Sequence, residues 1–398
     1  MEHSKIIQSM EASATLSLAQ RVRELRAAGK DVLGLTMGEP DFDTPAYIRE
    51  AAKTALDEGY THYPPVAGLP ELREEIAVKL RRENGLDYAP SQVVVSTGAK
   101  QSLYNVILSV LNPGDEAIVP APYWVSYTAM LHLAQARVRI LPTDISTSYK
   151  LTPGQLEEAL SPATRLLFLT TPSNPSGSMY SREELARLVE VIRHYPQLYV
   201  ISDEIYEHIA FEMPHVSLAS FEELKDRVIT VNGFSKGYAM TGWRLGYIAA
   251  PQAVANMCIK LQGQCTSGAN TFAQRGALAA LRGGLEAVHH MRDAFRQRRD
   301  QLYQRLSSIA GLKVLLPDGA FYFYPDLSHF LGMHTPTGKH ISNIDELCEY
   351  LIEEVHLAVV TGRAFGTSQH VRISYAYAME ELLRAMDRLE DGLSRLRR

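Results

Sequence analysis

Short hydrophobic runs alternate with longer amphipathic stretches through the middle of the chain. The runs are rich in valine, isoleucine and leucine, as in strands that are buried on both faces. We predict strands at VVVST (93–97), AIVPA (117–121), RLLFLT (165–170), YVISD (199–203), VITVN (228–232) and GYIAA (246–250). The amphipathic stretches predict helices over 100–111, 123–135, 181–195 and 252–262. This alternation is typical of a mostly parallel sheet covered by helices, with GYIAA as the candidate antiparallel strand because no full helix precedes it.

The two ends of the chain have a different pattern. The N-terminal part predicts helices over 14–28, 46–58 and 69–84, with a loop rich in glycine and proline, DVLGLTMGEPDFDTP (31–45), after the first. After about residue 285, helices and strands are more segregated, as in a small α+β domain. We predict helices over 286–308, 344–355 and 379–397, and strands at LKVLL (312–316), GAFYFYP (319–325), LAVVT (357–361) and HVRISYA (370–376). The first helix is expected to pack with this C-terminal part.

Composition narrows the class of protein. The 398 residues include 40 Lys and Arg against 45 Asp and Glu, so the net charge is −5 and the chain lacks the basic surface of a nucleic-acid-binding protein. No run reaches the roughly 18 apolar residues of a membrane helix, and the N-terminus does not resemble a signal peptide. The three cysteines form neither a disulfide framework nor a CxxC pair. We therefore expect a cytoplasmic protein with no metal site.

The segment VNGFSKGYAMTGWRLGY (231–247) contains a candidate nucleophile. Lys236 lies in a polar, glycine-containing turn after a predicted strand, among apolar and aromatic residues. Desolvation there would lower the pKa of the amine and prepare it to attack a carbonyl carbon. Ser235 and Arg244 would supply hydrogen-bond donors for a phosphate. The alternative interpretation is a solvated loop lysine beside an arginine that makes an ordinary ion pair.

Three other strand ends add polar groups. In STGAKQS (96–102), the backbone amides of Gly98, Ala99 and Lys100 would face an anion at a helix N-terminus. Asn174 follows a buried strand, where it could donate to a ring oxygen or simply form a turn. Asp203, in SDEIY (202–206), would point into the crevice at the carboxyl ends of the strands, or would cap the next helix.

Together these residues form one chemical set. They include a lysine for an imine, a carboxylate for a ring nitrogen, an amide and a phenol for a ring hydroxyl, and a cup for a phosphate. The set matches pyridoxal phosphate, whose ring needs an acidic partner to act as an electron sink.

The motifs GEPDFDTP, HYPPVAGLPELR, NPGDEAIVPAPYWVSY, SNPSG, SDEIYEH, SKGYAMTGWRLGY, GAFY and VRISYA follow in this order along nearly the whole chain. In these motifs the chain resembles the class I/II, fold-type I aminotransferases, and among them the bacterial aspartate and aspartate/prephenate subgroup. The resemblance implies an α/β fold with a seven-stranded-type, mostly parallel sheet in a large domain, residues 46–290. It also implies a small α+β domain built from residues 1–45 and 291–398.

The resemblance assigns cofactor roles to matching residues. Lys236 is expected to hold pyridoxal 5′-phosphate as a Schiff base, and Asp203 to pair with the pyridine nitrogen. Tyr63 is expected to reach the phosphate of the neighbouring subunit, which implies a homodimer with shared active sites. The other expected contacts, to the phosphate, the ring face or the ring oxygen, come from Ala99, Lys100, Trp124, Asn174, Tyr206, Ser235 and Arg244. Lys236, Asp203 and Tyr206 are the expected catalytic residues.

The resemblance also indicates how substrate binds. Arg372 is expected to grip the α-carboxylate bidentately, and Gly38, Trp124 and Asn174 to lie close to the substrate. Lys100, with Ser13 and Thr15, would hold the second carboxylate of aspartate. The alternative for Lys100 is a solvent-facing residue at the start of a helix.

The function that follows is transfer of the amino group of L-aspartate to 2-oxoglutarate by a ping-pong mechanism, with Lys236 carrying the proton. Prephenate or aromatic amino acids would be second substrates. Alternatives with the same cofactor are an aromatic amino acid aminotransferase and a C–S β-lyase. A non-enzymatic cofactor-binding sensor and an α/β binding protein without cofactor rank below these.

Overall fold

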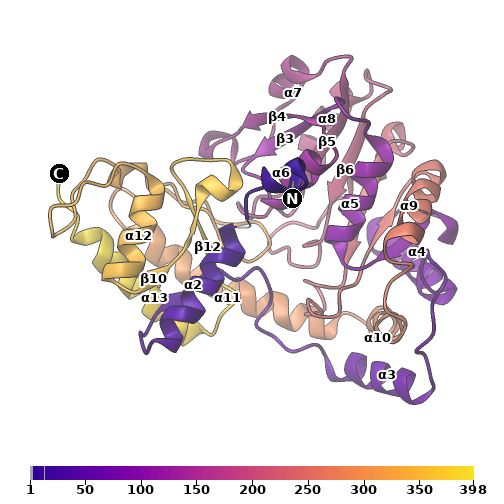
Figure 1. Ribbon diagram of the computed structural model, residues 1–398, viewed down its shortest axis with the longest axis horizontal. Coiled ribbons are helices and arrows are strands. Elements are labelled where there is room, and N and C mark those ends of the chain that lie inside the picture. Colours follow the sequence, from indigo (N-terminus) through magenta and orange to yellow (C-terminus); the bar gives the residue numbers. More distant parts are fainter. Residues whose placement is uncertain (1–2, 13) are drawn as a thin grey trace.

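A seven-stranded sheet lies at the centre of the computed structural model, which describes residues 3–12 and 14–398 (Figure 1). The strand order is β2-β8-β7-β6-β5-β3-β4. The strands are β2 (Val93–Ser96), β3 (Glu116–Ala121), β4 (Arg137–Pro142), β5 (Thr164–Thr170), β6 (Tyr199–Asp203), β7 (Val228–Gly233) and β8 (Gly246–Ala249). All neighbouring strands pair in parallel except β8, which is antiparallel to both β2 and β7. The predicted parallel sheet with GYIAA as its antiparallel member is therefore confirmed.

The sequence pattern missed one strand of this sheet. Edge strand β4 has the sequence RVRILP, and four of its six residues in succession, Arg137 to Ile140, are exposed. Because this strand lies at the edge of the sheet, it has no need of the continuous hydrophobic run by which buried strands are recognised.

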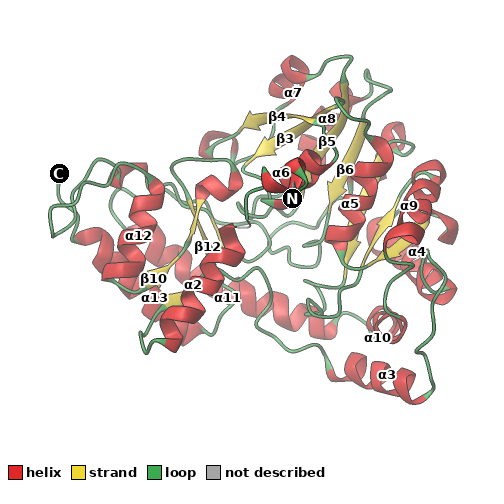
Figure 2. Cartoon of the chain, viewed as in Figure 1, coloured by secondary structure: helices red, strands yellow, loops and turns green. Residues whose placement is uncertain are grey.

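Helices cover both faces of the sheet and form a three-layer arrangement (Figure 2). Alternate residues of each strand enter different hydrophobic clusters, as strand geometry requires: Leu166 and Phe168 pack on one face of β5, Leu167 and Leu169 on the other. The covering helices are α3 (Ala46–Asp57), α4 (Pro70–Asn84), α5 (Ala99–Val110), α6 (Ser126–Leu133), α7 (Pro153–Ala159), α8 (Arg182–Ile192), α9 (Gln252–Cys265) and α10 (Thr271–Arg282). Side chains from α4, α8 and α10 enter one cluster, and those from α5, α6 and α9 enter the other.

Local sequence signals explain several helix starts. Helices α7 and α8 begin with capping boxes, at Thr152 and Ser181. In each, the hydroxyl accepts a hydrogen bond from the backbone amide three residues later, and the Gln or Glu side chain at that later position accepts one from the backbone amide of the capping residue. Asn270 caps α10 in the simpler way, accepting from the amide of Ala273. Helices α7 and α10 are absent from the prediction, although these caps were readable in the sequence.

The two ends of the chain pack together beside the large sheet. Figure 1 shows the indigo helix α2 among the yellow C-terminal elements. The elements are α2 (Ala14–Ala27), β1 (Leu33–Gly34), α11 (Glu286–Ser308), β9 (Tyr322–Phe323), α12 (Ile344–Glu354), β10 (Leu357–Ala358), β11 (Val360–Thr361), β12 (Val371–Ser374) and α13 (Met379–Ser394). The short helix α1 (Lys5–Gln8) lies apart from them and contacts α6. Strand β1 pairs in parallel with β10, while β11, β12 and β9 form an antiparallel sheet.

Three expectations for this part need correction. LKVLL forms no strand; only Lys313 makes an isolated bridge, to Asp326. The predicted strand LAVVT is divided at Val359 into β10 and β11, because its halves pair with different partners. The predicted loop after the first helix contains the two-residue strand β1, whose short pairing leaves no periodic pattern to detect. Among the described residues, no helix has the length and apolar character needed to cross a lipid bilayer.

Candidate active site

The candidate residues gather at the carboxyl ends of three neighbouring strands. Asn174 follows β5, Asp203 ends β6 and Lys236 follows β7, and the three strands are adjacent in the order β7-β6-β5. Parallel strands place their carboxyl ends at one edge, so side chains far apart in sequence meet there. From the terminal part of the chain, Arg372 in β12 reaches Asn174, and Gly38 reaches Lys236.

Lys236 is half-buried, and its ammonium donates a hydrogen bond to the carbonyl oxygen of Gly38. Its Nζ lies 5.7 Å from the centre of the Tyr206 ring and 5.9 Å from that of Phe321. Burial lowers the pKa of Lys236 to about 8, with the positive charges of Arg372 and Arg244 acting in the same direction. The side chain is therefore a desolvated amine with an accessible neutral form, and the alternative of a freely solvated loop lysine does not hold.

Asp203 is only 5% exposed. Its Oδ2 accepts a hydrogen bond of 2.6 Å from the hydroxyl of Tyr127, which also lies 2.8 Å from Thr170 Oγ1. Burial raises the pKa of Asp203 to about 6, although the hydrogen bond from Tyr127 opposes this shift. A turn follows β6 where the capping alternative requires a helix, so Asp203 is not a helix cap.

Two tyrosines and a buried guanidinium form another part of the site: Tyr206 comes from the turn after β6, whereas Tyr322 and Arg372 come from β9 and β12. The hydroxyls of Tyr206 and Tyr322 are 2.8 Å apart. Arg372, 2% exposed, lies over the Tyr322 ring, with 4.5 Å between its Cζ and the ring centre. Its Nη1 donates to Asn174 Oδ1 (3.0 Å) and its Nη2 to the carbonyl of Thr36 (2.8 Å), while the buried Nε has no hydrogen-bond partner among the described residues. An unpaired donor of this kind suits a planar anion such as a carboxylate.

A second set of donors surrounds the start of α5. Gly98 precedes this helix with a φ of 83°, and a Cβ there would overlap the guanidinium of Arg244. The first-turn amides of Ala99 and Lys100 therefore lie close to the Arg244 guanidinium. Ser235 is buried and follows β7, two residues after its end. Arg244 donates to the carbonyl of Thr241 (2.8 Å) and makes no ion pair among the described residues. Together with the helix N-terminus, these donors fit a phosphate.

Lys100 is exposed, but its side chain does not simply extend into solvent. Its Nζ lies 4.8 Å from the centre of the Trp124 ring. Partial burial lowers the pKa of Lys100, and the charge of Arg244 adds to the effect. Trp124 in turn packs edge-to-face against Tyr127, so Lys100 and Asp203 are connected through two aromatic rings.

Of the predicted site residues that the structure describes, Tyr63 is not brought to this cluster within one chain. Tyr63 is 91% exposed. Ser13 lies outside the described residues, and of Thr15 only the backbone, in α2, is described.

Two residues in contact with the site were not predicted. Tyr127 comes one helical turn after Trp124 in PYWVSY, so the spacing of these aromatics was a readable signal. Tyr322 in GAFYFYP was hidden because it is one of four consecutive aromatics after Ala320, and sequence alone does not say which one faces the site.

The residues present fit pyridoxal phosphate by the chemistry of their donor set. A nucleophilic amine lies near a buried carboxylate, and a helix N-terminus with an arginine lies at another side of the same site. The unpartnered Nε of Arg372 leaves one further donor for the carboxylate of a substrate.

Comparison with known proteins gives consistent matches. Residues 30–389 match the family model described as aminotransferase class I and II. The chain is 47% identical over 391 residues to the bifunctional aspartate aminotransferase and glutamate/aspartate-prephenate aminotransferase of Petunia hybrida, covering 97% of this chain and 82% of that one. It is 46% identical over 389 residues to the aspartate/prephenate aminotransferase of Cereibacter sphaeroides, with 97% of each chain covered.

Solved structures agree over the whole chain. The aspartate aminotransferase from Rhizobium meliloti superposes with a TM-score of 0.97 at 39% identity, covering 100% of both chains. The aspartate aminotransferase from Thermus thermophilus with maleate gives a TM-score of 0.92 at 39% identity, covering 98% of this chain and 100% of that one.

Proposed function

Because the chain belongs to the class I and II aminotransferases, we propose that it transfers the amino group of L-aspartate to 2-oxoglutarate, yielding oxaloacetate and L-glutamate. The family implies dependence on pyridoxal phosphate. The observation that carries the proposal is the convergence of a desolvated amine (Lys236), a buried carboxylate (Asp203) and a guanidinium with a free donor (Arg372) at one sheet edge.

Bound pyridoxal phosphate would supply the electron sink for the reaction. We propose that Lys236 holds it covalently and that Asp203 faces its ring nitrogen. The remaining contacts would come from Ala99 and Lys100 amides, Ser235 and Arg244 for the phosphate, Asn174 and Tyr206 for the ring oxygen, and Trp124 for the ring face. Tyr63, exposed on one protomer, would complete the phosphate site of its partner in a homodimer.

The side chains around the reacting carbon would have separate roles in proton transfer and charge stabilisation. Lys236 Nζ would take the α-proton of the substrate and return it, acting first as a base and then as an acid. A pKa of about 8 suits this role, since both protonation states are then accessible near neutral pH. Asp203 would place a negative charge beside the ring nitrogen, and its burial would strengthen that interaction. The Tyr206 and Tyr322 hydroxyls would hold the ring oxygen from one side.

Arg372 would bind the α-carboxylate of every substrate. Hydrogen bonds to Asn174 and to the Thr36 carbonyl hold its guanidinium in place, so the group is oriented before the substrate arrives. Stacking on Tyr322 and Phe365 limits its rotation further.

The choice of aspartate rests on a second cation in the same site. Lys100 is held over Trp124, from where its ammonium would meet the distal carboxylate of a dicarboxylic substrate, with Ser13 and Thr15 as further partners. The relatives support this choice, since they are named for aspartate, and the Thermus thermophilus structure holds maleate, a dicarboxylate. Two of them are also named for prephenate, which combines a carboxylate with a ring, so prephenate is the second candidate acceptor.

A panel of amino donors against 2-oxoglutarate tests the proposal. The wild-type protein should use aspartate with a higher kcat/KM than phenylalanine, tyrosine or alanine. Lys100→Ala should lower kcat/KM for aspartate by about 100-fold and for phenylalanine by less than about threefold, because only aspartate loses an ion pair. Lys53→Ala, a change at an exposed lysine paired with Glu50, is the matched control and should change neither value.

Two results would contradict the proposal. Equal losses for aspartate and phenylalanine would remove Lys100 from substrate selection. Release of pyruvate from a sulfur amino acid, without any 2-oxo acid present, would instead indicate a C–S β-lyase.

We also propose a division into two domains that meet at this site. The two hydrophobic clusters on the faces of the large sheet involve buried residues between Ile48 and Val288, which fits a large domain of residues 46–290. A third cluster is built chiefly from residues before 46 and after 290, with Tyr206 and Ile209 at its edge, which fits a small domain of residues 1–45 and 291–398.

A further inference from the structure

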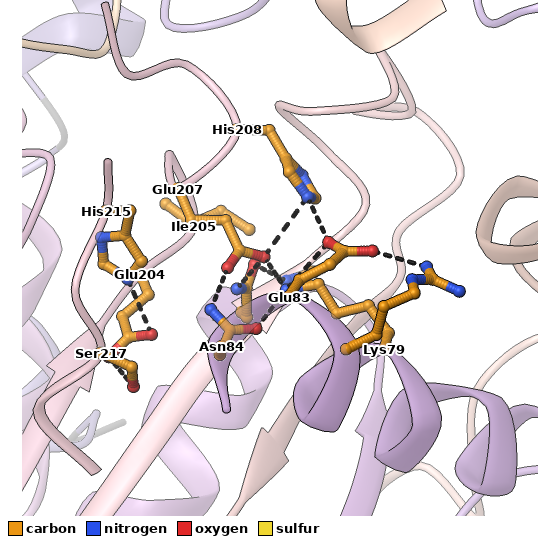
Figure 3. A network of polar contacts seen from close by, with 12 residues as sticks. Lys79, Glu83, Asn84, Glu204, Ile205, Glu207, His208, His215 and Ser217 are labelled. Carbon is orange, nitrogen blue, oxygen red and sulfur yellow. Dashed lines mark hydrogen bonds and ion pairs between the residues drawn. The ribbon is translucent and has the colours of Figure 1, made fainter. Parts of the chain in front are cut away.

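A buried network of charged and polar side chains lies behind the candidate site (Figure 3). We call it the Glu207 network, and its members are Lys79, Glu83, Asn84, Glu207, His208 and Asn232. At its centre the Lys79 ammonium, 1% exposed, contacts the Glu207 carboxylate at very short range. Lys79 also donates to Asn84 Oδ1 (2.9 Å) and lies 3.7 Å from Glu83 Oε2. Lysine is rarely buried to this degree, so the arrangement calls for an explanation.

Glu207 joins three separate stretches of the chain. Its Oε2 accepts from Asn84 at the end of α4 (2.8 Å), and its Oε1 accepts from Asn232 in β7 (2.7 Å). Its own backbone belongs to the turn that follows β6. Burial alone would raise the pKa of Glu207, but the charge of Lys79 outweighs burial and holds the pKa well below its usual range. The carboxylate is therefore ionised, and donors from α4 and β7 satisfy it.

The same three stretches position the candidate catalytic groups. The turn after β6 contains Asp203 and Tyr206, which face the site, whereas Glu204 and Glu207 of the same turn face away from it. Strand β7, held through Asn232, leads directly to Lys236. His208 contacts the turn on the other side of that lysine, since a Cβ at Gly237 would lie 2.6 Å from His208 Nδ1. His208 is itself fixed by Glu83 Oε2 at 2.9 Å.

We propose that Lys79 and Glu207 are positioning residues that set the distance and orientation between Tyr206 and Lys236. This inference rests on the roles proposed above for those two residues. Neither Lys79 nor Glu207 touches the site; the pair acts by fixing the two turns from which the catalytic side chains project.

Stability alone does not account for the pair. A buried salt bridge contributes little to folding compared with a well-packed hydrophobic pair of similar volume, because both charges lose their hydration. Its geometric effect is larger, since two amides and an ammonium restrict one carboxylate to a single orientation. Small errors in position matter at an active site, where a displacement of about 1 Å reduces the rate by about 100-fold.

A double-mutant cycle tests the proposal: Lys79→Met, Glu207→Gln and the two combined, each purified with cofactor. Lys79→Met leaves a buried carboxylate without its cation, so we expect kcat with aspartate to fall about 100-fold while KM changes less than about threefold. The combined variant buries no unpaired charge and should recover about tenfold of that loss. The matched control is Lys150→Met with Glu184→Gln, a partly buried pair at α8 that hydrogen-bonds neither Asp203 nor Lys236, and it should leave kcat unchanged.

A spectroscopic measurement separates positioning from stability. The absorbance of the bound cofactor changes with pH as Lys236 and its surroundings titrate, and its midpoint depends on their geometry. We expect the midpoint of Lys79→Met to move by at least about 0.5 pH unit from wild type, well below the temperature at which the variant unfolds. The control pair should keep the wild-type midpoint.

The outcomes are distinct. Wild-type kcat and midpoint in Lys79→Met, with only a lower unfolding temperature, would overturn the proposal. If Lys79→Met does not fold, Glu207→Gln and the combined variant decide by the same two measurements. A wild-type protein that binds cofactor but transfers no amino group would refute the proposed function, and the midpoint comparison would still test the positioning.

Discussion

The two sides of the candidate site are built in different ways. Asp203 and Lys236 extend from β6 and β7, which pair with neighbours along both edges inside a seven-stranded sheet. Gly38, Tyr322 and Arg372 come from the terminal part of the chain, where β1, β9, β10 and β11 have two residues each. There the geometry depends on side chains, such as the Tyr377 hydroxyl that accepts from the amides of Thr36 (3.1 Å) and Met37 (3.0 Å).

This difference indicates a division of roles. Groups that are proposed to handle the proton and the ring charge are attached to strands that pair with a neighbour on each side. Groups that are proposed to bind the substrate carboxylate are attached to backbone with few strand pairings, which yields more readily when a ligand arrives. Changes on the sheet side should therefore act on kcat, and changes on the terminal side on KM.

The largest effect is expected for Lys236→Ala. Without the amine, transamination should fall by more than about 10⁵-fold, and the visible absorbance band of bound cofactor should disappear. Steady-state assays and an absorbance spectrum of the purified variant measure both effects. Retained transamination would mean that the sheet side does not carry the chemistry.

Asp203→Asn should lower kcat by about 10²- to 10³-fold, because a neutral amide does not stabilise positive charge at the ring nitrogen. Stability should change in the opposite direction. The raised pKa of Asp203 means that the protonated side chain favours folding below about pH 4, and that this contribution is lost as pH rises through about 6.

At pH 8 the cofactor-free variant should therefore resist urea better than cofactor-free wild type, by about 1–3 kcal/mol. At pH 4 the two proteins should unfold at similar urea concentrations. A variant that is less stable at pH 8 would show that Asp203 is not strained by burial.

Arg372→Lys should raise KM for aspartate, phenylalanine and 2-oxoglutarate alike, by about 100-fold, because an ammonium cannot form two parallel hydrogen bonds to a carboxylate. Its effect on kcat should be much smaller, and the cofactor spectrum should stay as in wild type. A loss confined to aspartate would place the α-carboxylate elsewhere.

Tyr377→Phe is expected to give the smallest effect. Loss of the hydroxyl leaves the Thr36 and Met37 amides without their acceptor, which costs about 1 kcal/mol, or roughly a fivefold rise in KM. Steady-state kinetics with aspartate would measure it. A fall in kcat instead of a rise in KM would contradict the proposal that the terminal side acts on substrate binding and the sheet side on kcat.

The sequence allowed the sheet side to be predicted well, for a physical reason. Asn174, Asp203 and Lys236 each follow a hydrophobic run, and the carboxyl ends of parallel strands meet at one edge whatever the loop lengths are. The contact of Arg372 with Asn174 spans 198 positions and depends on how short strands pack, which no local pattern encodes. The family resemblance, rather than periodicity, supplied that residue.

The positions behind the site were missed for a different reason. Lys79 lies in an amphipathic helix, where a lysine normally indicates the solvent side. It is buried here because it pairs with Glu207, and that partner is 128 positions away along the chain, where no local pattern reveals it. Tyr127 lies in PYWVSY, where no local pattern identifies it as the donor to Asp203. A buried polar contact needs both partners to be known before either can be interpreted.

The pairing of β1 with β10 has a consequence for biosynthesis. Leu33 leaves the ribosome 324 positions before its partner Leu357, a delay of roughly 16–65 s at 5–20 residues per second. Until then the apolar face of helix α2 lacks Ala358 and Ile352, which cover it in the folded protein. The seven-stranded sheet has all its strands earlier, once β8 ends at Ala249. The nascent chain should therefore depend on chaperone protection at its first helix, and the substrate-binding half of the enzyme should mature only after translation is nearly finished.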